Sequence, residues 1–183
     1  MATKKWVLFL TSILLANLGF AWDYNLSLGY GRSKEAGLYY YQQLFMLDGQ
    51  ASPFAKIDKT LNFGLGATLV NWHVATKEHS NMTAAAASVI FRAYFVPPKP
   101  TAQFRPYLTV SFGPACLFNR QLGERKQGGP FAFLVTMGGG SEIKIGKREF
   151  DLSLKLVHCS NGGMYSPNQG IDVWCVLSIG YLI

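Results

Sequence analysis

A histidine and a serine lie two positions apart near the end of the chain, at His158 and Ser160. If this stretch is a β-strand, both side chains share one face, roughly 6.5 to 7 Å apart at the backbone. An imidazole that leans toward the hydroxyl then reaches hydrogen-bonding distance. A serine becomes an effective nucleophile when a base takes its proton, and that base needs a third group to fix its tautomer. The spacing therefore fits a serine hydrolase whose third member lies elsewhere in the chain.

The strand expected to carry these two residues, 149–160, alternates between apolar and polar side chains. Leu154 and Leu156 lie on the face that continues to His158 and Ser160, whereas the opposite face carries mostly polar side chains. Other segments alternate in the same way, with a second face rich in Gly and small residues, as the crowded lumen of a small barrel requires. The apolar face is then the one that contacts lipid. A polar pair on that face is costly, so it indicates either a functional site or a polar rim where the barrel leaves the membrane.

Segments of this kind recur along the whole chain. Eight of them are expected as strands, at 22–31, 38–47, 59–72, 83–96, 106–118, 130–145, 149–160 and 171–182. Bacterial outer-membrane barrels have an even number of strands, and eight is the smallest common number. The predicted fold class is therefore all-β, an eight-stranded antiparallel transmembrane β-barrel. The four alanines at 84–87 fit the start of a helix equally well.

Composition and the first residues agree with an exported membrane protein. The 183 residues are 49% hydrophobic and 15% charged, with a net charge of +7, which is too apolar for a disordered chain and too poor in charge for an ordinary soluble helical domain. Lys4 and Lys5 precede an uncharged run that ends at Ala21, which predicts a signal peptide over 1–21 and a barrel domain over 22–183. The alternative is an uncleaved membrane helix, although the run is short for a span of ~20 residues.

Charged side chains on the lumen face must find partners, because a buried charge without one is costly. We expect six of them to satisfy one another in a polar plug: Asp23, Arg92, Glu142, Lys144, Asp151 and Lys155. The three cysteines have no C-x-x-C spacing, so no zinc module is indicated, and no calcium set or other cofactor site is expected. Cys159 is expected in the lumen. Cys175 is expected there too, and a disulfide between the two stays open.

The segment that contains His158 and Ser160 resembles the signature of a known enzyme family. Residues 157–172 read VHCSNGGMYSPNQGID, with H-x-S-N at the start, P-N-x-G further on and an acidic residue at the end. This pattern is similar to that of the lipid A 3-O-deacylase (PagL) family of outer-membrane enzymes. The rest of the chain agrees with that family mainly in length, export signal and barrel pattern.

The resemblance implies a role for each residue of the motif. Ser160 is the implied nucleophile, His158 the general base and Asp172 the acidic member of a triad. Asn161 and the backbone amide of Gly163 are implied to form the oxyanion hole. The acid in this family is typically Glu. An Asp is one methylene shorter, so its reach to His158 needs checking.

The implied reaction is hydrolysis of the ester-linked acyl chain at the 3-position of lipid A, in the outer membrane of a Gram-negative bacterium. The expected partners are lipopolysaccharide as substrate and the surrounding outer-membrane lipids, with no nucleic acid. The net charge of +5 that remains after signal cleavage suits anionic lipid A phosphates. Two alternatives stay open, an outer-membrane phospholipase and a non-enzymatic structural or adhesion barrel. The sequence does not decide between a monomer and a homodimer.

Strand register tests the acidic member independently. Opposite residues in an antiparallel hairpin have a constant index sum and share a face, so Asp172 across from His158 points to lipid as well. Continued unchanged, this register turns Leu177 and Ile179 into the lumen. We therefore predict a β-bulge near 176–178 that resets the register. The alternative is that Asp172 points inward.

Overall fold

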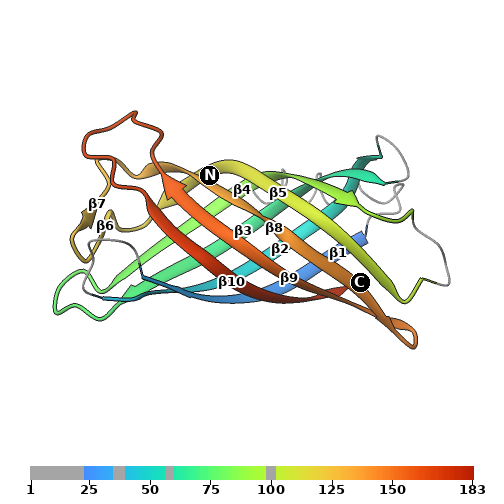
Figure 1. Cartoon of the computed structure of the whole chain (residues 1–183). Coiled ribbons are helices and arrows are strands. Elements are labelled where there is room, and N and C mark those ends of the chain that lie inside the picture. The colour runs from blue at the N-terminus through green and yellow to red at the C-terminus, as the bar shows by residue number, and fades with distance from the viewer. Residues whose placement is uncertain (1–22, 35–39, 57–59, 98–101) are drawn as a thin grey trace, which may run out of the picture.

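The computed structural model describes residues 23–34, 40–56, 60–97 and 102–183, and in this part of the chain eight long antiparallel strands close into a barrel (Figure 1). They are β1 (Asp23–Ser33), β2 (Gln42–Lys56), β3 (Leu61–Val74), β4 (Asn81–Tyr94), β5 (Phe104–Leu117), β8 (Phe131–Ile145), β9 (Arg148–Ser160) and β10 (Ile171–Leu182). The loop after β5 contains a small hairpin of β6 (Gln121–Leu122) and β7 (Arg125–Lys126). The predicted eight-stranded barrel is confirmed. The predicted signal peptide, 1–21, lies outside the described residues.

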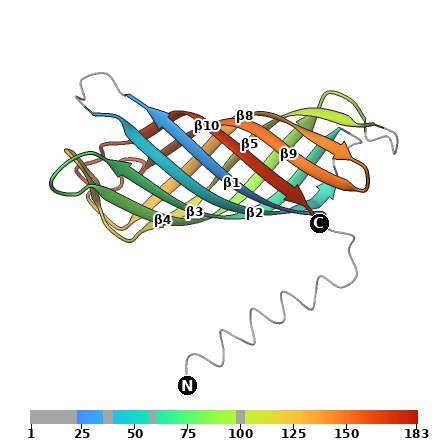
Figure 2. The same ribbon diagram turned by 90° about the horizontal axis from the view of Figure 1, so that it is seen from below.

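Each long strand pairs with the long strands that precede and follow it in the chain. The first and the last, β1 and β10, pair with each other and close the barrel (Figure 2). The loops between strands differ at the two ends. The end of β10 and the tight turn at Gly146 lie at one end of the barrel. The positive φ of Gly146, 65°, suits a residue without a side chain. The other end, called the loop end below, carries β6, β7 and residues 161–170. Among the described residues, no helix has the length and apolar character that crossing a membrane requires.

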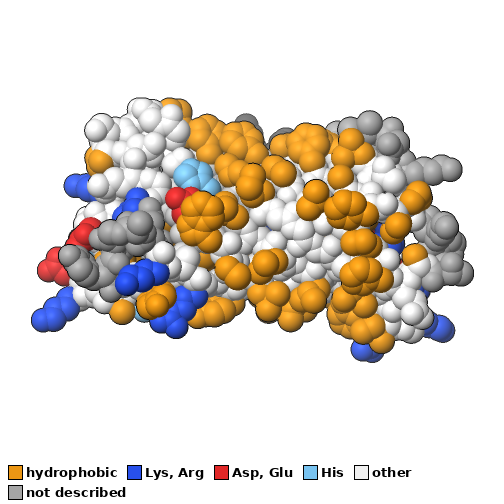
Figure 3. Space-filling view, in the orientation of Figure 1, with side chains coloured by type: hydrophobic (Ala, Val, Ile, Leu, Met, Phe, Trp, Pro, Cys, Tyr) orange, Lys and Arg blue, Asp and Glu red, His pale blue; other side chains and the backbone are white. Residues whose placement is uncertain are grey.

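The predicted alternation is visible in the exposure of the strand side chains. On β1, Leu26 and Leu28 are 53% and 68% exposed, whereas Asn25 and Ser27 are buried in the lumen. The same division holds on β9, where Leu154 is exposed. On the face that Figure 3 shows, hydrophobic side chains cover much of the barrel wall, with lysine and arginine side chains beyond them at both ends. An apolar belt of this kind is the surface that a bilayer covers.

The strand predicted at 83–96 is confirmed over its helical alternative, whereas the second strand differs from its prediction. The alanine-rich stretch at 84–87 lies within β4 and is not a helix, because both of its edges pair with neighbouring strands. The second strand begins at Gln42 and continues well beyond the predicted end. It continues because Asp48 faces the lumen, where the Thr68 hydroxyl donates to its carboxylate at 2.8 Å and Lys155 lies 3.5 Å away.

The lumen is filled by packed side chains that sort by polarity along its length. In the half away from the loop end, Arg92 lies 2.9 Å from Glu142 and 3.3 Å from Asp151, which confirms the polar plug for these residues. The prediction was wrong for Asp23, which is exposed at the barrel rim, and for Lys144, which pairs outside the lumen with a glutamate of β9. Their places are taken by Asp48 and Arg105.

The half of the lumen next to the loop end is apolar. Its buried members come from all eight long strands except β1, and Trp72, Leu44, Met82 and Val157 are among the most deeply buried. Burial of this kind stabilises by roughly 25 cal/mol per Å² of apolar surface removed from water. A packed apolar plug therefore lies directly behind the wall that carries His158, and it gives the strands there a rigid backing.

Candidate active site

The register of β9 and β10 decides which residues share the outer face. Asp172 lies opposite His158, as predicted, and the register shifts between Val173 and Val176. After this shift Leu177 pairs with Leu154, and both point outward. The predicted bulge is confirmed, although it lies slightly earlier than 176–178. Asp172 therefore points to the outer face, and the alternative of an inward carboxylate is wrong.

The same bulge explains the positions of the cysteines. Cys159 is fully buried in the lumen, as predicted. Cys175 is exposed and not in the lumen, because the extra residue of the bulge lets Trp174 and Cys175 both lie on the outside. All three cysteines are free, so the disulfide that the sequence left open does not form.

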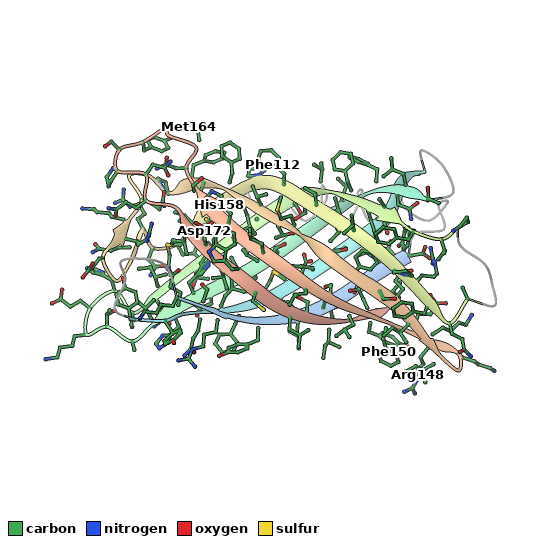
Figure 4. All side chains as sticks on the ribbon, viewed as in Figure 1. Phe112, Arg148, Phe150, His158, Met164 and Asp172 are labelled. Atoms are coloured by element: carbon green, nitrogen blue, oxygen red, sulfur yellow. The ribbon has the colours of Figure 1, made fainter. Side chains whose placement is uncertain are left out.

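His158, Ser160 and Asp172 meet on the outside of the barrel wall, near the loop end (Figure 4). The serine Oγ lies 3.0 Å from Nε2 of the imidazole, and the carboxylate Oδ1 lies 2.6 Å from Nδ1. The aspartate therefore reaches the histidine without the extra methylene of a glutamate. The side chains of His158 and Asp172 are 37% and 27% exposed, so the site is partly open.

This geometry can activate a serine. A carboxylate at Nδ1 holds the proton on that nitrogen, which leaves Nε2 as an acceptor that faces the hydroxyl. When Nε2 takes the serine proton, the ring becomes a cation and the adjacent carboxylate stabilises it. Hydroxyl, imidazole and carboxylate thus stand in the order that nucleophilic acyl transfer requires.

Neighbouring groups fix the position of the triad, and sequence reasoning missed most of them. The Ser33 hydroxyl donates to the backbone carbonyl of Asp172 at 3.0 Å, and Arg125 Nη1 donates to the carbonyl of Gly170 at 2.8 Å. Gly170 packs against the ring itself, since a Cβ there would lie 3.1 Å from Cε1 of His158. The sequence motif included Gly170, but Ser33 and Arg125 are distant in the chain and gave no signal.

The loop after Ser160 is held together by one buried amide. Asn161 is fully buried; its Nδ2 donates to the carbonyls of Tyr165 and Pro167, and its Oδ1 accepts from the backbone N–H of Gly163 at 3.0 Å. Its own backbone N–H donates to Oδ1 of Asn168 at 3.0 Å. Both implied oxyanion donors, the Asn161 side chain and the Gly163 amide, are thus bonded within the loop. In this structure the hydrogen bonds of the Asn161 amide tie that loop together.

The surroundings of the triad are apolar. Ser160 pairs across the sheet with Phe133, whose ring stacks on Phe112 at 5.3 Å between centroids. Trp174 follows Asp172 on β10 and is 63% exposed. No group of His, Cys, Asp and Glu among the described residues is arranged to hold a metal ion. The polar triad therefore lies at the edge of the belt that lipid covers.

A closed eight-stranded barrel with an apolar belt defines an outer-membrane β-barrel, and the triad gives this one the groups of a serine hydrolase on its lipid-facing side. The model of the family described as Lipid A 3-O-deacylase (PagL) matches residues 34–181. The chain therefore belongs to the PagL family of lipid A 3-O-deacylases and is an outer-membrane enzyme. Family membership favours this activity over the phospholipase and adhesion alternatives.

Solved structures support the fold. The crystal structure of the outer membrane enzyme PagL is similar with a TM-score of 0.65 and 19% identity, over 87% of this chain and 98% of that chain. The crystal structure of Neisserial surface protein A (NspA) has a TM-score of 0.53 and 9% identity, over 87% and 96%. Among curated proteins, none matches the sequence. Nothing in these comparisons supports a homodimer.

Proposed function

We propose that Ser160, His158 and Asp172 are the catalytic triad with which this chain hydrolyses the ester-linked acyl chain at the 3-position of lipid A. The observation that carries the proposal is the continuous pair of contacts, 2.6 Å from carboxylate to imidazole and 3.0 Å from imidazole to hydroxyl. Both contacts lie on the side of the barrel wall that faces lipid, where the ester of a membrane lipid is found.

The reaction follows the order of the contacts. The Ser160 oxygen attacks the ester carbonyl while Nε2 of His158 takes its proton, and the carbonyl π electrons move to the oxygen. Collapse of this tetrahedral intermediate releases the 3-hydroxyl of the sugar, which receives the proton from His158. Water then attacks the acyl-enzyme with the same base, and the fatty acid leaves with Ser160 restored.

For the oxyanion hole we propose the backbone N–H of Gly163, with Asn161 in a positioning role. The N–H now donates to Oδ1 of Asn161. A hydrogen bond to an ionised acceptor is roughly twice as strong as a neutral one, so a developing oxyanion competes well for this donor. The positive φ of Gly162 and Gly163, 63° and 81°, gives the loop a backbone conformation in which its amides turn toward one side.

Position in the membrane supports this substrate. Outer-membrane barrels have short turns on the periplasmic side and longer loops outside, so the loop end with its triad faces the cell surface. Lipid A occupies the outer leaflet there. Its acyl chains can stay beside exposed side chains such as Leu152 and Leu154 of β9 while the sugar ester reaches Ser160.

The experiment compares lipid A from a lipopolysaccharide-bearing host that expresses the wild type, Ser160→Ala or the control Ser80→Ala, a loop serine outside the triad. We expect wild type and Ser80→Ala to remove one hydroxyacyl chain, seen by mass spectrometry, and Ser160→Ala to leave lipid A intact. Heat-dependent migration on gels checks that each barrel is folded. Unchanged lipid A with the folded wild type would contradict the proposed reaction, and activity in Ser160→Ala would exclude this nucleophile.

A further inference from the structure

A cavity of about 530 Å³ opens at the loop end, and none of the three triad residues lines it. It is lined by residues of the loop after β3, of the segment that contains the β6–β7 hairpin and of residues 161–170, all of which lie at the loop end of the barrel (Figure 1). Volumes of this size are typical of sites for small ligands. Its lining includes Ser166 and Pro167 of the loop that follows Ser160, so the cavity and the site share one segment of chain.

The cavity is positively charged. Arg120 and Lys126 line it together with His79, and none of the described residues that line it is acidic. Within the described part of the chain, neither Arg120 nor Lys126 forms an ion pair with a carboxylate. Two cations without a counter-ion on one concave surface attract an anion, and phosphate is the anion that such pairs commonly bind.

A neutral polar group completes the lining. Gln127 is 1% exposed; its Nε2 donates to the carbonyl of Gln169 at 2.6 Å, whereas its Oε1 has no partner among the described residues. A buried acceptor without a donor costs roughly 1–3 kcal/mol, so a ligand that brings a hydroxyl removes this cost. Cations for a phosphate and an acceptor for a hydroxyl are together the complement of a phosphorylated sugar.

The cavity wall is bonded directly to the loop that bears the site. The carbonyl of Pro167 accepts from the backbone N–H of Gly128 at 2.7 Å and also from Nδ2 of Asn161 at 3.3 Å. On the other side, the carbonyl of His79 accepts from the N–H of Gly123 at 2.8 Å, with His79 in the left-handed region at a φ of 53°. This conformation is costly for a residue with a side chain, and the hydrogen bond holds it there.

We propose that this cavity binds the phosphorylated sugar of the lipid substrate and so positions the ester at Ser160. The proposal rests on the proposed function, because it takes the ligand to be the head group of the lipid that the triad cleaves. Arg120 and Lys126 bind the phosphate, and Oε1 of Gln127 accepts from a sugar hydroxyl. The cavity contributes to substrate binding and to positioning, and none of its residues takes part in the chemical step.

The test uses the full-length folded protein in detergent with two substrates, phosphorylated lipid A and the same lipid with its phosphates removed. For the double variant Arg120→Gln/Lys126→Gln we expect KM for phosphorylated lipid A to rise about tenfold with kcat nearly unchanged, as the loss of two partly screened charge contacts predicts. KM for the dephosphorylated lipid stays the same in both proteins. The matched control is Lys147→Gln/Arg148→Gln, which makes the same change in net charge at the β8–β9 turn, at the opposite end of the barrel.

Equal KM values for the two lipids in the wild type, or an equal rise in the control variant, would overturn the proposal. A soluble sugar phosphate, glucosamine 6-phosphate, tests the other source of the same chemistry. If glucosamine 6-phosphate inhibits the wild type fully and binds as tightly as phosphorylated lipid A in micelles, the cavity takes free sugar phosphates and not the lipid head group.

A binding measurement separates this inference from the proposed function. Ser160→Ala is mixed with either lipid in micelles, and the bound lipid is measured without turnover. If no lipid A is cleaved by any variant but the phosphorylated lipid binds more tightly through Arg120 and Lys126, the proposed function fails and the binding site stands. Equal binding of both lipids overturns the binding site whether or not cleavage occurs.

Discussion

Replacing Asp172 by asparagine removes one charge from the triad and leaves its shape. The carboxylate lies 2.6 Å from Nδ1 of His158, and in the proposed mechanism it stabilises the imidazolium that forms when Ser160 loses its proton. Two unit charges about 4 Å apart interact with about 1 kcal/mol in water and about 4 kcal/mol at an effective dielectric constant of 20. Since the two side chains are 37% and 27% exposed, an intermediate value applies.

We expect Asp172→Asn to lower kcat by about 30- to 150-fold, which corresponds to about 2–3 kcal/mol. A fully buried triad carboxylate contributes more, about 10⁴-fold, because its asparagine variant also holds the wrong tautomer. Here solvent reaches the side chain, so the amide can turn its oxygen toward Nδ1. The exposed position also leaves room for a longer acid, and Asp172→Glu is expected to keep more activity than Asp172→Asn.

The assay measures fatty acid released from lipid A in mixed micelles by purified, folded protein, with Ser160→Ala as the blank. Heat-dependent gel migration confirms that each variant is folded before rates are compared. An Asp172→Asn rate within about twofold of the wild type would refute the reasoning, because a carboxylate that supports the imidazolium cannot be removed at so small a cost. Only His158 and Ser160 would then remain as the catalytic pair.

Three further predictions concern packing, charge and thiols. Gly170→Ala places a Cβ about 3.1 Å from Cε1 of His158, so the ring must move, and we expect kcat on lipid A to fall about tenfold in a barrel of unchanged stability; unaltered kcat would contradict this. Arg92→Leu leaves the buried carboxylate of Asp151 without the cation 3.3 Å from it, whereas Glu142 keeps Arg105 at 2.9 Å, so the free energy of unfolding in urea is expected to fall by about 3–5 kcal/mol. A urea midpoint equal to that of the wild type would show that the polar plug does not depend on Arg92. Alkylation of the denatured protein without reductant is expected to label all three cysteines, and a mass with a single label would mean that two of the three are paired.

The sequence was sufficient to place the site residues on one face, because side chains along a strand alternate with a period of two. Leu154 and Leu156 fixed the outer face of β9, and strict alternation then placed His158 and Ser160 on it. The resemblance supplied Asp172, and constant index sums in an antiparallel pair tested it. The structure confirms the shared outer face and the register, and the catalytic roles of these residues stay a prediction.

The contacts that local geometry does not determine were missed. Ser33 and Asp172 are 139 positions apart, and only closure of the barrel between β1 and β10 brings them together. The lumen charges were partly wrong for a related reason. Alternation gives the face of Asp23 but not its depth, and a side chain at the rim reaches solvent whichever face it occupies.

The bulge in β10 reconciles two requirements that a regular strand cannot meet. The triad needs Asp172 on the outer face opposite His158, and the bilayer needs Leu177 and Ile179 on that same face. The first position is even and the other two are odd, so an unbroken strand would send either the acid or the leucine and isoleucine into the lumen. One extra residue between Val173 and Val176 changes the parity once, just below the site. An active site on the lipid-facing wall of this barrel therefore requires one change of parity in a strand. The chain makes this change within β10, and the register of β9 with β8 stays unbroken.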